Sequence, residues 1–335
     1  MVTQVVTSDI FRRHDNIGHP ENAERTLVMY QAVQQSPIVD YLSFIEPELY
    51  PEEPLYQIHS ERMIERIKEI SASQSSWLDL DTYVCKHDFE TARYAIGGTV
   101  QLIRNIYDGE ATNGFALVRP PGHHATSKTS MGFCLFNNIA LAAQELVNKG
   151  KKVLIFDLDV HHGNGTQDIF YASNKVLYQS FHLSPHFPGT GAVQEIGIEE
   201  GKGYTVNVPL SFGHGNTAVE TLMKEIFLPI ATQFNPDFIL VSSGFDSHYA
   251  DPLGGMHLTV DMFGWLLEQL LTIQSRLVCT LEGGYNLSVI GPCLISQLSV
   301  LSGHPLFYKD MVAEQDGWKP IVKTIKNKMK KYWDI

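Results

Sequence analysis

Four short stretches of this sequence combine residue types that carry out metal-dependent and acid–base chemistry. Each stretch follows a run of apolar residues, so the reactive groups begin where the run ends. In open α/β sheets, ligands bind in the crevice outside the carboxyl ends of the strands. We therefore expect the four stretches to meet at one rim of a sheet. They are Arg119–His124, Asp157–His162, Ser243–Asp246 and Glu282–Tyr285.

The second of these stretches predicts a metal site. In extended backbone, residues two apart face the same side, which places Asp157, Asp159 and His161 together and turns His162 away. Three ionisable groups are costly to bury unless a cation compensates them, and two carboxylates with one imidazole suit zinc. Asp246 is the other candidate for the second carboxylate, which would free Asp157 for another role. Capping of the next helix is the structural alternative for the Asp pair.

Two further kinds of residue point to proton transfer at the same rim. His123 and His124 follow a stiff Pro-Pro-Gly turn, and paired imidazoles beside a metal-bound water suit acid–base catalysis at neutral pH. Tyr285 follows two glycines, which permit a tight turn, and a phenol there can donate a hydrogen bond to a developing oxyanion. Taken singly, a histidine pair bonded to backbone carbonyls and an ordinary core tyrosine are the simpler explanations.

The pattern of the elements that must position these groups indicates one doubly wound α/β domain. The apolar runs lack polar alternation, which is typical of parallel strands buried on both faces, and helical stretches lie between them. We therefore predict a mainly parallel sheet with helices on both faces. The predicted strands are Gly114–Val118, Val153–Val160, Val176–Phe181, Phe238–Ser242 and Leu277–Leu281. The predicted helices are Asp88–Tyr107, Asn138–Lys149, Asn216–Phe234 and Thr259–Gln274.

Composition excludes several classes of protein. The 335 residues carry 37 acidic and 25 basic side chains, a net charge of −12. This balance argues against direct binding of nucleic acid, which needs an excess of Lys and Arg, but it tolerates a lysine-rich peptide. No apolar stretch reaches the ~18 residues of a membrane span, and the N-terminus lacks the apolar run of a secretory signal. Four cysteines without CxxC spacing are typical of reduced thiols, so we expect a cytoplasmic protein.

Residues 319–335 differ from the rest, because six lysines and one acid give them a net charge of +5. Ile321, Ile325, Met329 and Trp333 recur every four residues, which predicts an amphipathic helix. We expect this basic C-terminal helix to pack on, or extend from, a domain of residues 1–318. Contact with a membrane surface or an acidic partner is the alternative.

Six motifs, in this order, resemble those of the histone deacetylase family over roughly residues 8–303. They are RPPGHHA (119–125), GFCLFNN (132–138), DLDVHHGNGTQ (157–167), FPGTG (187–191), SSGFDSHYADPLGG (242–255) and LEGGYN (281–286). The Asn in HHGNG resembles the class II branch, whereas class I members usually have Asp there. The resemblance implies an arginase-like α/β fold and zinc-dependent hydrolysis of an acyl-lysine amide. Residues 1–318 would then be the deacetylase catalytic domain.

The resemblance also implies roles for single residues. The implied zinc ligands are Asp159, His161 and Asp246, and the implied catalytic groups are His123, His124, Tyr285, Asp157 and Asn164. His124 would act as general base and acid, with His123 beside it as an electrostatic partner held by Asp157. Asn164, the partner of His124, is a neutral amide and stabilises an imidazolium less than a carboxylate does. We therefore expect a lower pKa for His124 than in class I enzymes.

A structural potassium ion and a narrow tunnel for the lysine stem are implied as well. The potassium ligands would be Asp157, Asp159, Ser180 and the carbonyls of His161 and Phe181. Phe133 and Phe187 would wall the tunnel, and the other residues implied at the substrate are Gly132, Leu253 and Asp81, the last of these at the substrate backbone. Arg25 resembles an arginine near the exit path of the acetate.

Deacetylation of acetylpolyamines or other small amides is the principal alternative within this fold. Leu253 stands where one type of polyamine-specific relative has a glutamate that recognises a second ammonium, which favours acyl-lysine peptides or proteins. A non-catalytic acyl-lysine binder usually loses a zinc ligand, a histidine of the pair or the tyrosine, and all are present here. An arginase-like hydrolase with two metals needs more carboxylates. The sequence does not decide between acetyl and longer acyl groups, between a monomer and an oligomer, or between zinc and ferrous iron.

Overall fold

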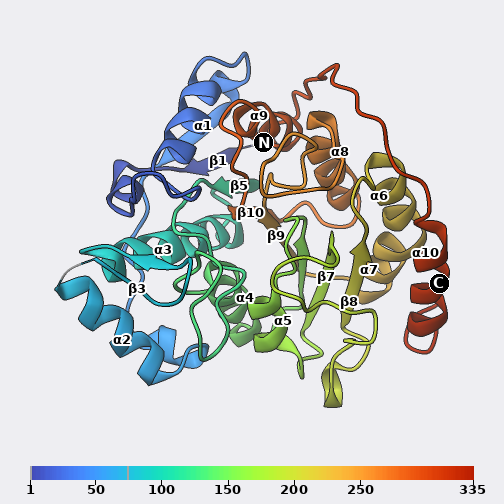
Figure 1. Cartoon of the computed structure of the whole chain (residues 1–335), viewed down its shortest axis with the longest axis horizontal. Coiled ribbons are helices and arrows are strands. Elements are labelled where there is room, and N and C mark those ends of the chain that lie inside the picture. Colours follow the sequence, from blue (N-terminus) through green and yellow to red (C-terminus); the bar gives the residue numbers. More distant parts are fainter. Residues whose placement is uncertain (1, 74) are drawn as a thin grey trace.

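A computed structural model of the chain describes residues 2–73 and 75–335. Its centre is an eight-stranded parallel sheet with the strand order β2-β1-β5-β10-β9-β6-β7-β8 (Figure 1). Its strands are β1 (Thr3–Val6), β2 (Leu42–Ile45), β5 (Asn113–Ala116), β6 (Val153–Asp157), β7 (Val176–Leu183), β8 (Thr205–Leu210), β9 (Phe238–Ser243) and β10 (Leu277–Leu281). A separate antiparallel ribbon consists of β3 (Ser76–Trp77) and β4 (Tyr83–Val84).

Helices cover both faces of the large sheet (Figure 1). On one face lie α1 (Glu24–Gln34), α6 (Asn216–Leu222), α7 (Leu228–Phe234), α8 (Val260–Leu271), α9 (Ile290–Leu301) and α10 (Lys319–Met329). On the other lie α2 (Glu61–Ala72), α3 (Asp88–Tyr107), α4 (Asn138–Asn148) and α5 (Asn164–Phe170). The predicted α/β class, with a parallel sheet between two helical layers, is confirmed.

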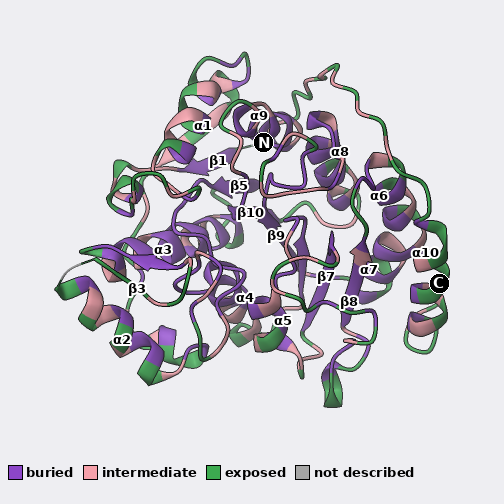
Figure 2. Cartoon of the chain, viewed as in Figure 1, coloured by how far each residue is buried: buried purple, intermediate pink, exposed green. Residues whose placement is uncertain are grey.

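Two hydrophobic cores, one on each face of the sheet, explain why the strands lack polar alternation. Along β6, Leu154 and Phe156 belong to the core with α6–α9, whereas Val153 and Ile155 belong to the core with α3 and α4. Both sets are fully buried, so an apolar residue is needed at every position of the strand. Figure 2 shows the strands buried and the exposed residues confined mainly to the outer helices and loops.

Most predicted elements agree with the structure, within a few residues. The predicted helix Asp88–Tyr107 is α3, and the predicted helix Asn216–Phe234 comprises α6, a π-helical turn (Met223–Phe227) and α7. The prediction passed over β1, β2 and β8. Their sequences, TQVV, LSFI and TVNVPL, contain polar residues, and a search for uninterrupted apolar runs misses such strands.

One predicted boundary is wrong in a way that matters for the site. The predicted strand Val153–Val160 ends at Asp157, so Asp159 and His161 lie on a loop and not on a strand face. The Leu158 N–H still donates to the Ser242 carbonyl of β9, but from Asp159 on, carboxylates replace the neighbouring strand as acceptors for the backbone. Asp157 Oδ1 accepts from the Asp159 N–H at 3.3 Å, and Asp246 Oδ1 accepts from the Val160 N–H at 2.8 Å.

The C-terminal helix α10 packs on the domain through one apolar side. Ile325 and Met329 are each 1% exposed, and the Trp333 Nε1–H donates to the Gly203 carbonyl at 2.7 Å. The helix ends at Met329, before the predicted end at residue 335, and Lys323 on it is exposed.

Two expectations from the composition can be compared with the structure. All four cysteines are free and buried. In the part of the chain that the structure describes, no helix is both long and apolar enough to cross a membrane.

Substitution of Ile325 tests whether the packing of α10 contributes to stability. We expect Ile325→Ala to lower the free energy of unfolding by about 2–5 kcal/mol, because it leaves a cavity under the helix. Lys323→Gln, on the exposed side of the same helix, is the control and should change it by less than about 0.5 kcal/mol. Urea denaturation measures the free energy of unfolding of both variants. If Ile325→Ala changed it as little as Lys323→Gln does, the helix would contribute no packing energy.

Candidate active site

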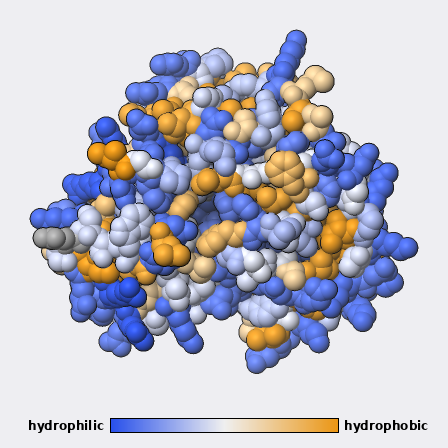
Figure 3. Space-filling model, in the orientation of Figure 1, coloured by the Kyte–Doolittle hydropathy of each residue, from blue (hydrophilic) through white to orange (hydrophobic). Residues whose placement is uncertain are grey.

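The four polar stretches follow four neighbouring strands of the sheet. In the order β5-β10-β9-β6, these strands lead to His123 and His124, to Tyr285, to Asp246, and to the loop with Asp159 and His161. Because the strands are parallel, their carboxyl ends lie along one rim, as the sequence predicts. Figure 3 shows the molecular surface hollowed near the middle of this view, beside β10 and above α4 as labelled in Figure 1.

Asp159, His161 and Asp246 form a compact cluster that suits a divalent metal ion. The ligand atoms of the three residues lie within 4.8 Å of one another. His161 Nδ1 is 2.9 Å from Asp159 Oδ1 and 3.1 Å from Asp246 Oδ2. Both carboxylates are fully buried, whereas the imidazole is partly exposed. Two carboxylates and one imidazole are a ligand set that zinc accepts, and an open side leaves room for substrate.

The backbone holds these carboxylates in place. Asp159 Oδ2 accepts from the Gly283 N–H at 2.8 Å, and Asp159 Oδ1 accepts from the His161 N–H at 2.9 Å. Glycine is required where the chain passes this close. A Cβ on Gly244 would lie 2.0 Å from Asp159 Oδ2, and one on Gly283 would lie 2.0 Å from Asp246 Oδ2.

The two carboxylates create a strongly negative field at the His161 imidazole. Burial alone would lower the pKa of His161, but its hydrogen bonds to Asp159 and Asp246 outweigh burial and raise the pKa to about 10. Burial and the nearby Asp159 raise the pKa of Asp246 to about 7. The same field attracts a divalent cation, and protons compete with metal for these ligand atoms.

His123 is fixed as a charged group. Its Nδ1 lies 3.1 Å from Asp157 Oδ2, which also accepts a hydrogen bond from the Tyr178 hydroxyl at 3.0 Å. Burial would lower the pKa of His123, but the carboxylates of Asp157, Asp159 and Glu282 raise it to about 10. His123 therefore contributes positive charge beside the cluster.

His124 has the opposite character. Burial first, and then the neighbouring His123 and His161, hold its pKa well below the usual value. Its Nδ1 lies 2.8 Å from Asn164 Oδ1, at the first residue of α5. Because that amide oxygen only accepts, Nδ1 carries the hydrogen and Nε2 keeps its lone pair. A neutral imidazole with a free Nε2 is suited to act as a general base.

Tyr285 is held from two sides. Its backbone N–H donates to Asp251 Oδ2 at 2.6 Å, and the Arg25 guanidinium lies 4.9 Å from the centre of its ring. Arg25 also donates to the carbonyls of Glu282 and Gly284, each at 2.6 Å, and so braces the same turn. Burial raises the pKa of the Tyr285 phenol well above its ordinary value, so its hydroxyl stays a donor.

Aromatic rings line the approach to this cluster. The Phe187 ring lies 5.0 Å from that of His124, and the Phe133 ring lies 5.8 Å from that of Tyr285. Gly132 has a φ of +56°, and a Cβ there would lie 2.5 Å from His124 Cδ2 and 2.9 Å from Phe187 Cε1. Only glycine therefore lets Phe187 approach His124 here.

Four other residues that the sequence predicts at the substrate or at potassium have the following surroundings. The Leu253 carbonyl is bonded to His186, whose ring stacks on that of His161 at 4.9 Å. The half-buried Asp81 has its carbonyl 3.1 Å from His19 Nε2. Ser180, followed by the buried Phe181, pairs with Asp157 in the register of β6 and β7.

Sequence reasoning assigned no role to Glu282, which organises the histidine pair. Its Oε2 accepts from the backbone N–H groups of Gly122 and His123 at 2.7 and 3.1 Å, and its Oε1 accepts from Ser242. Burial raises its pKa to about 7. The available signal was an acid directly before two glycines at the end of an apolar run. Asp251 was missed likewise, since only folding brings its carboxylate to Tyr285.

His162 lies away from the metal cluster, as the sequence predicts. Its two ring nitrogens are bonded to Thr190 and Gln167, at 2.7 and 3.1 Å.

Comparisons with known proteins show which family the chain belongs to. The sequence model described as "Histone deacetylase domain" matches residues 19–301, most of the chain. The chain belongs to the histone deacetylase family. The class II-like resemblance seen in the sequence is supported by this match and by the relatives described below. Family membership supports deacetylase activity and places the chain among hydrolases.

Two relatives and one solved structure illustrate this membership. A "Probable deacetylase" of Archaeoglobus fulgidus is 33% identical over 96% of this chain and 91% of its own length. "Histone deacetylase 15" of Arabidopsis thaliana is 42% identical over 74% of this chain, but the match spans only 46% of that longer protein. A crystal structure of the HDA15 HD domain superposes with a TM-score of 0.93, at 34% identity, over 99% of this chain and 97% of that one.

The pH dependence of activity tests the role of Asn164. Because the pKa of His124 is depressed, the imidazole stays neutral below pH 6.5, and we expect kcat/KM to persist into acidic solution. Asn164→Asp puts a negative charge beside Nδ1, stabilises the imidazolium and raises that pKa. The acidic limb of the kcat/KM profile should then move to higher pH. An unmoved limb would contradict the assignment of His124 as the base.

Proposed function

We propose that this protein is a zinc-dependent deacylase that removes acetyl or other acyl groups from the ε-amine of lysine in peptides or proteins. The main support is the convergence of a metal-ligand set, a charged and a neutral histidine, and a half-buried tyrosine at one rim of the sheet. Each group alone has a simpler explanation, but together they supply every function that hydrolysis of an amide requires.

Asp159, His161 and Asp246 would hold the zinc ion, and their donor set and spacing fit it. Zinc bound there would polarise the amide carbonyl and lower the pKa of a water molecule towards neutrality. The carboxylate of Asp159 stays ionised for that task, because the charge of His123 and the hydrogen bonds from His161 hold its pKa below the usual value.

His124 would move the protons. Its Nε2 would take a proton from the attacking water and then give it to the leaving lysine amine, which needs a neutral imidazole at the start. Asn164 fixes the tautomer through Nδ1, and the positive charge of His123 keeps the pKa of His124 low. Asp157 would hold His123 in that charged state.

Tyr285 would donate its hydroxyl to the oxygen of the amide as negative charge develops on it. Asp251 and Arg25 keep this side chain oriented through the backbone and the ring, so no reorganisation is needed during the reaction.

The substrate would enter between Phe133 and Phe187, with Gly132 at the base of this passage and Leu253 and Asp81 nearer its rim. The Phe187 ring lies beside His124 and the Phe133 ring beside Tyr285, and aromatic walls of this kind suit an unbranched aliphatic stem, as in acyl-lysine. Leu253 offers no carboxylate to a second ammonium, which favours peptides over acetylpolyamines.

A potassium ion is proposed at Asp157, Ser180 and Phe181, where oxygen ligands from β6 and β7 adjoin. The cytoplasmic location and the absence of direct nucleic-acid binding remain predictions from the sequence, which leaves the oligomeric state open.

Removal of the metal is the first test of the proposal. We expect turnover of an acetyl-lysine peptide to fall to background after treatment with a chelator, and to return with zinc. Asp246→Asn should fold but bind less than stoichiometric zinc in a metal analysis, because one ligand charge is lost. Acetylated polyamines run in parallel decide the substrate class. Full turnover by protein verified to be free of metal would exclude metal-dependent hydrolysis.

Tyr285→Phe tests the oxyanion role. Loss of one such donor should lower kcat by about 10²–10³-fold with little change in KM. The ring, its contact with Arg25 and the bond to Asp251 are all kept in this variant. Tyr30→Phe removes a hydroxyl from an exposed tyrosine of α1 and should leave turnover unchanged. A Tyr285→Phe enzyme with wild-type kcat would refute the assignment.

A further inference from the structure

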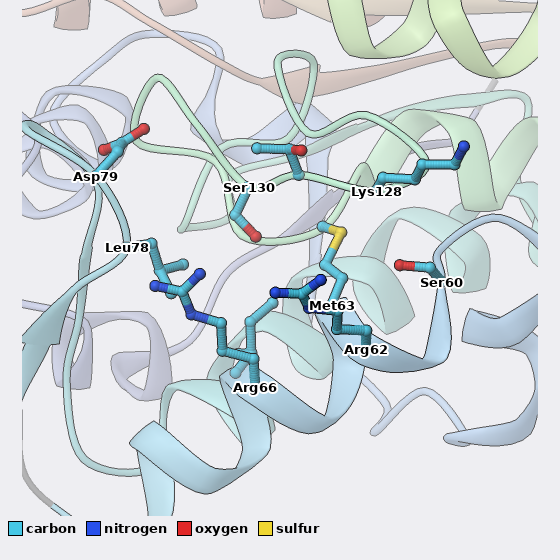
Figure 4. A pocket seen from close by; sticks show the side chains of 10 residues that line it. Ser60, Arg62, Met63, Arg66, Leu78, Asp79, Lys128 and Ser130 are labelled. Atoms are coloured by element: carbon cyan, nitrogen blue, oxygen red, sulfur yellow. The ribbon is translucent and has the colours of Figure 1, made fainter.

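A cavity of about 490 Å³ lies between α2 and two loops that also reach the candidate active site. Figure 4 shows side chains of α2 on one side of it and those of the loops at residues 78–79 and 128–130 on the other. The lining includes three basic side chains and one acidic one, namely Arg62, Arg66, Lys128 and Asp79. Its floor is partly apolar, with Met63 and Ile67 buried.

The basic groups of this cavity are not neutralised by the protein. Among the described residues, no carboxylate lies within 4.0 Å of the charged ends of Arg62, Arg66 or Lys128. Lys68, on the same helix, by contrast pairs with Glu52 at 2.5 Å and with Glu65 at 3.9 Å.

Their arrangement costs stability. Arg62 and Arg66 are four residues apart on α2, where like charges repel each other. Helical spacing also puts Glu65 three residues after Arg62 and Glu69 three residues after Arg66, but neither ion pair forms. Asp79 balances only one of the three positive charges, and its Oδ1 accepts from the N–H groups of Asp81 and Thr82. An anion from outside would satisfy this excess of positive charge.

The cavity adjoins the passage proposed for the acyl-lysine. Ser130, in its lining, is two residues before Gly132. Leu78, on the other loop, donates its N–H to the Thr82 carbonyl at 2.8 Å, and Thr82 Oγ1 accepts from the Phe133 N–H at 3.1 Å. One wall of the cavity is thus joined by hydrogen bonds to the aromatic wall of the passage.

We infer that this cavity is a specificity subsite that binds an acidic side chain of the same peptide whose acyl-lysine is hydrolysed. The inference rests on the proposed function and adds a substrate class to it, acyl-lysine peptides with Asp or Glu close to the lysine. Guanidinium groups bind carboxylates in a two-point geometry, and the apolar floor accommodates the methylene groups of such a side chain. The protein as a whole carries a charge of −12, so the excess of cations at this place differs from the average character of the molecule.

Acetyl-lysine peptides with one Asp at each position from three before to three after the lysine test the inference. Peptides with Asn at the same positions are the neutral controls. In at least one position we expect kcat/KM for the Asp peptide to exceed that for the Asn peptide by about tenfold, or ~1.4 kcal/mol. The preference should shrink at high salt, because the guanidinium groups are exposed.

A double variant that removes two positive charges tests whether the cavity, and not another part of the protein, causes the preference for Asp peptides. Arg62→Gln with Arg66→Gln should bring the Asp-to-Asn ratio to about one and leave turnover of the Asn peptides unchanged. Lys323→Gln with Lys331→Gln removes the same charge from exposed positions near the C-terminus and should keep the ratio. An Asp-to-Asn ratio of one in the wild type, or an unchanged ratio in the arginine variant, would overturn the inference.

Two further outcomes distinguish a failure of the inference from a failure of the proposed function. Absence of turnover for every peptide would contradict the proposed function. Fluorescence anisotropy with the labelled Asp and Asn peptides would then decide the subsite, since binding needs no hydrolysis. Free succinate tests the other source of a carboxylate. If it binds in the wild type and not in the arginine variant, while the Asp peptides show no preference, the cavity takes a free anion and the inference fails.

Discussion

The burial of several carboxylates at one rim of the sheet is the constraint on which the rest of this structure depends. Asp157, Asp159, Asp246 and Glu282 are all fully buried there, and an ionised carboxylate is costly to remove from water. The protein compensates them with backbone N–H groups at the ends of parallel strands, with glycines that let the backbone come close, and with the charged His123. The compensation is incomplete at Asp246, whose pKa is raised to about 7 by burial and by the nearby Asp159, and a divalent ion would supply the missing positive charge.

A second buried ionic network braces this rim from behind. Glu21 is bonded to both Arg119 and Arg25, all three fully buried, and so connects the end of β5 with α1. Burial alone would raise the pKa of Glu21, but Arg119 and His14 lower it well below its usual value. Removing one partner from such a network leaves a buried charge unpaired, so the network fixes the geometry of the turn before Tyr285.

The distribution of charge divides the molecule into regions of different character. The chain is acidic overall, α10 is basic on its exposed side, and the cavity beside α2 gathers three unpaired cations. Charges that pair within the protein, such as Lys68 with Glu52, contribute to local structure only. Charges left unpaired beside a reactive site instead affect which ligands approach it.

The sequence by itself determined the class of fold and identified the candidate reactive residues. Uninterrupted apolar runs followed by polar clusters were enough for the parallel sheet, because a strand buried on both faces needs an apolar residue at every position. The bounds of α3 followed from its pattern as well. The same reasoning missed β1, β2 and β8, because their sequences contain polar residues. It overextended β6, because the end of that strand depends on which partner takes each backbone N–H group.

Only the tertiary structure decided which strands are neighbours, and hence which groups meet. In the chain, β6 to β9 separate β5 from β10, but in the sheet β10 lies directly beside β5, and β9 lies between β10 and β6. That order brings Tyr285 and Glu282 to the histidine pair and Asp246 to His161 across long stretches of sequence. It also sets the opposite charge states of His123 and His124, which are adjacent in sequence. Their pKa values differ because burial and distant carboxylates act on each ring separately, and no local pattern of residues contains that information.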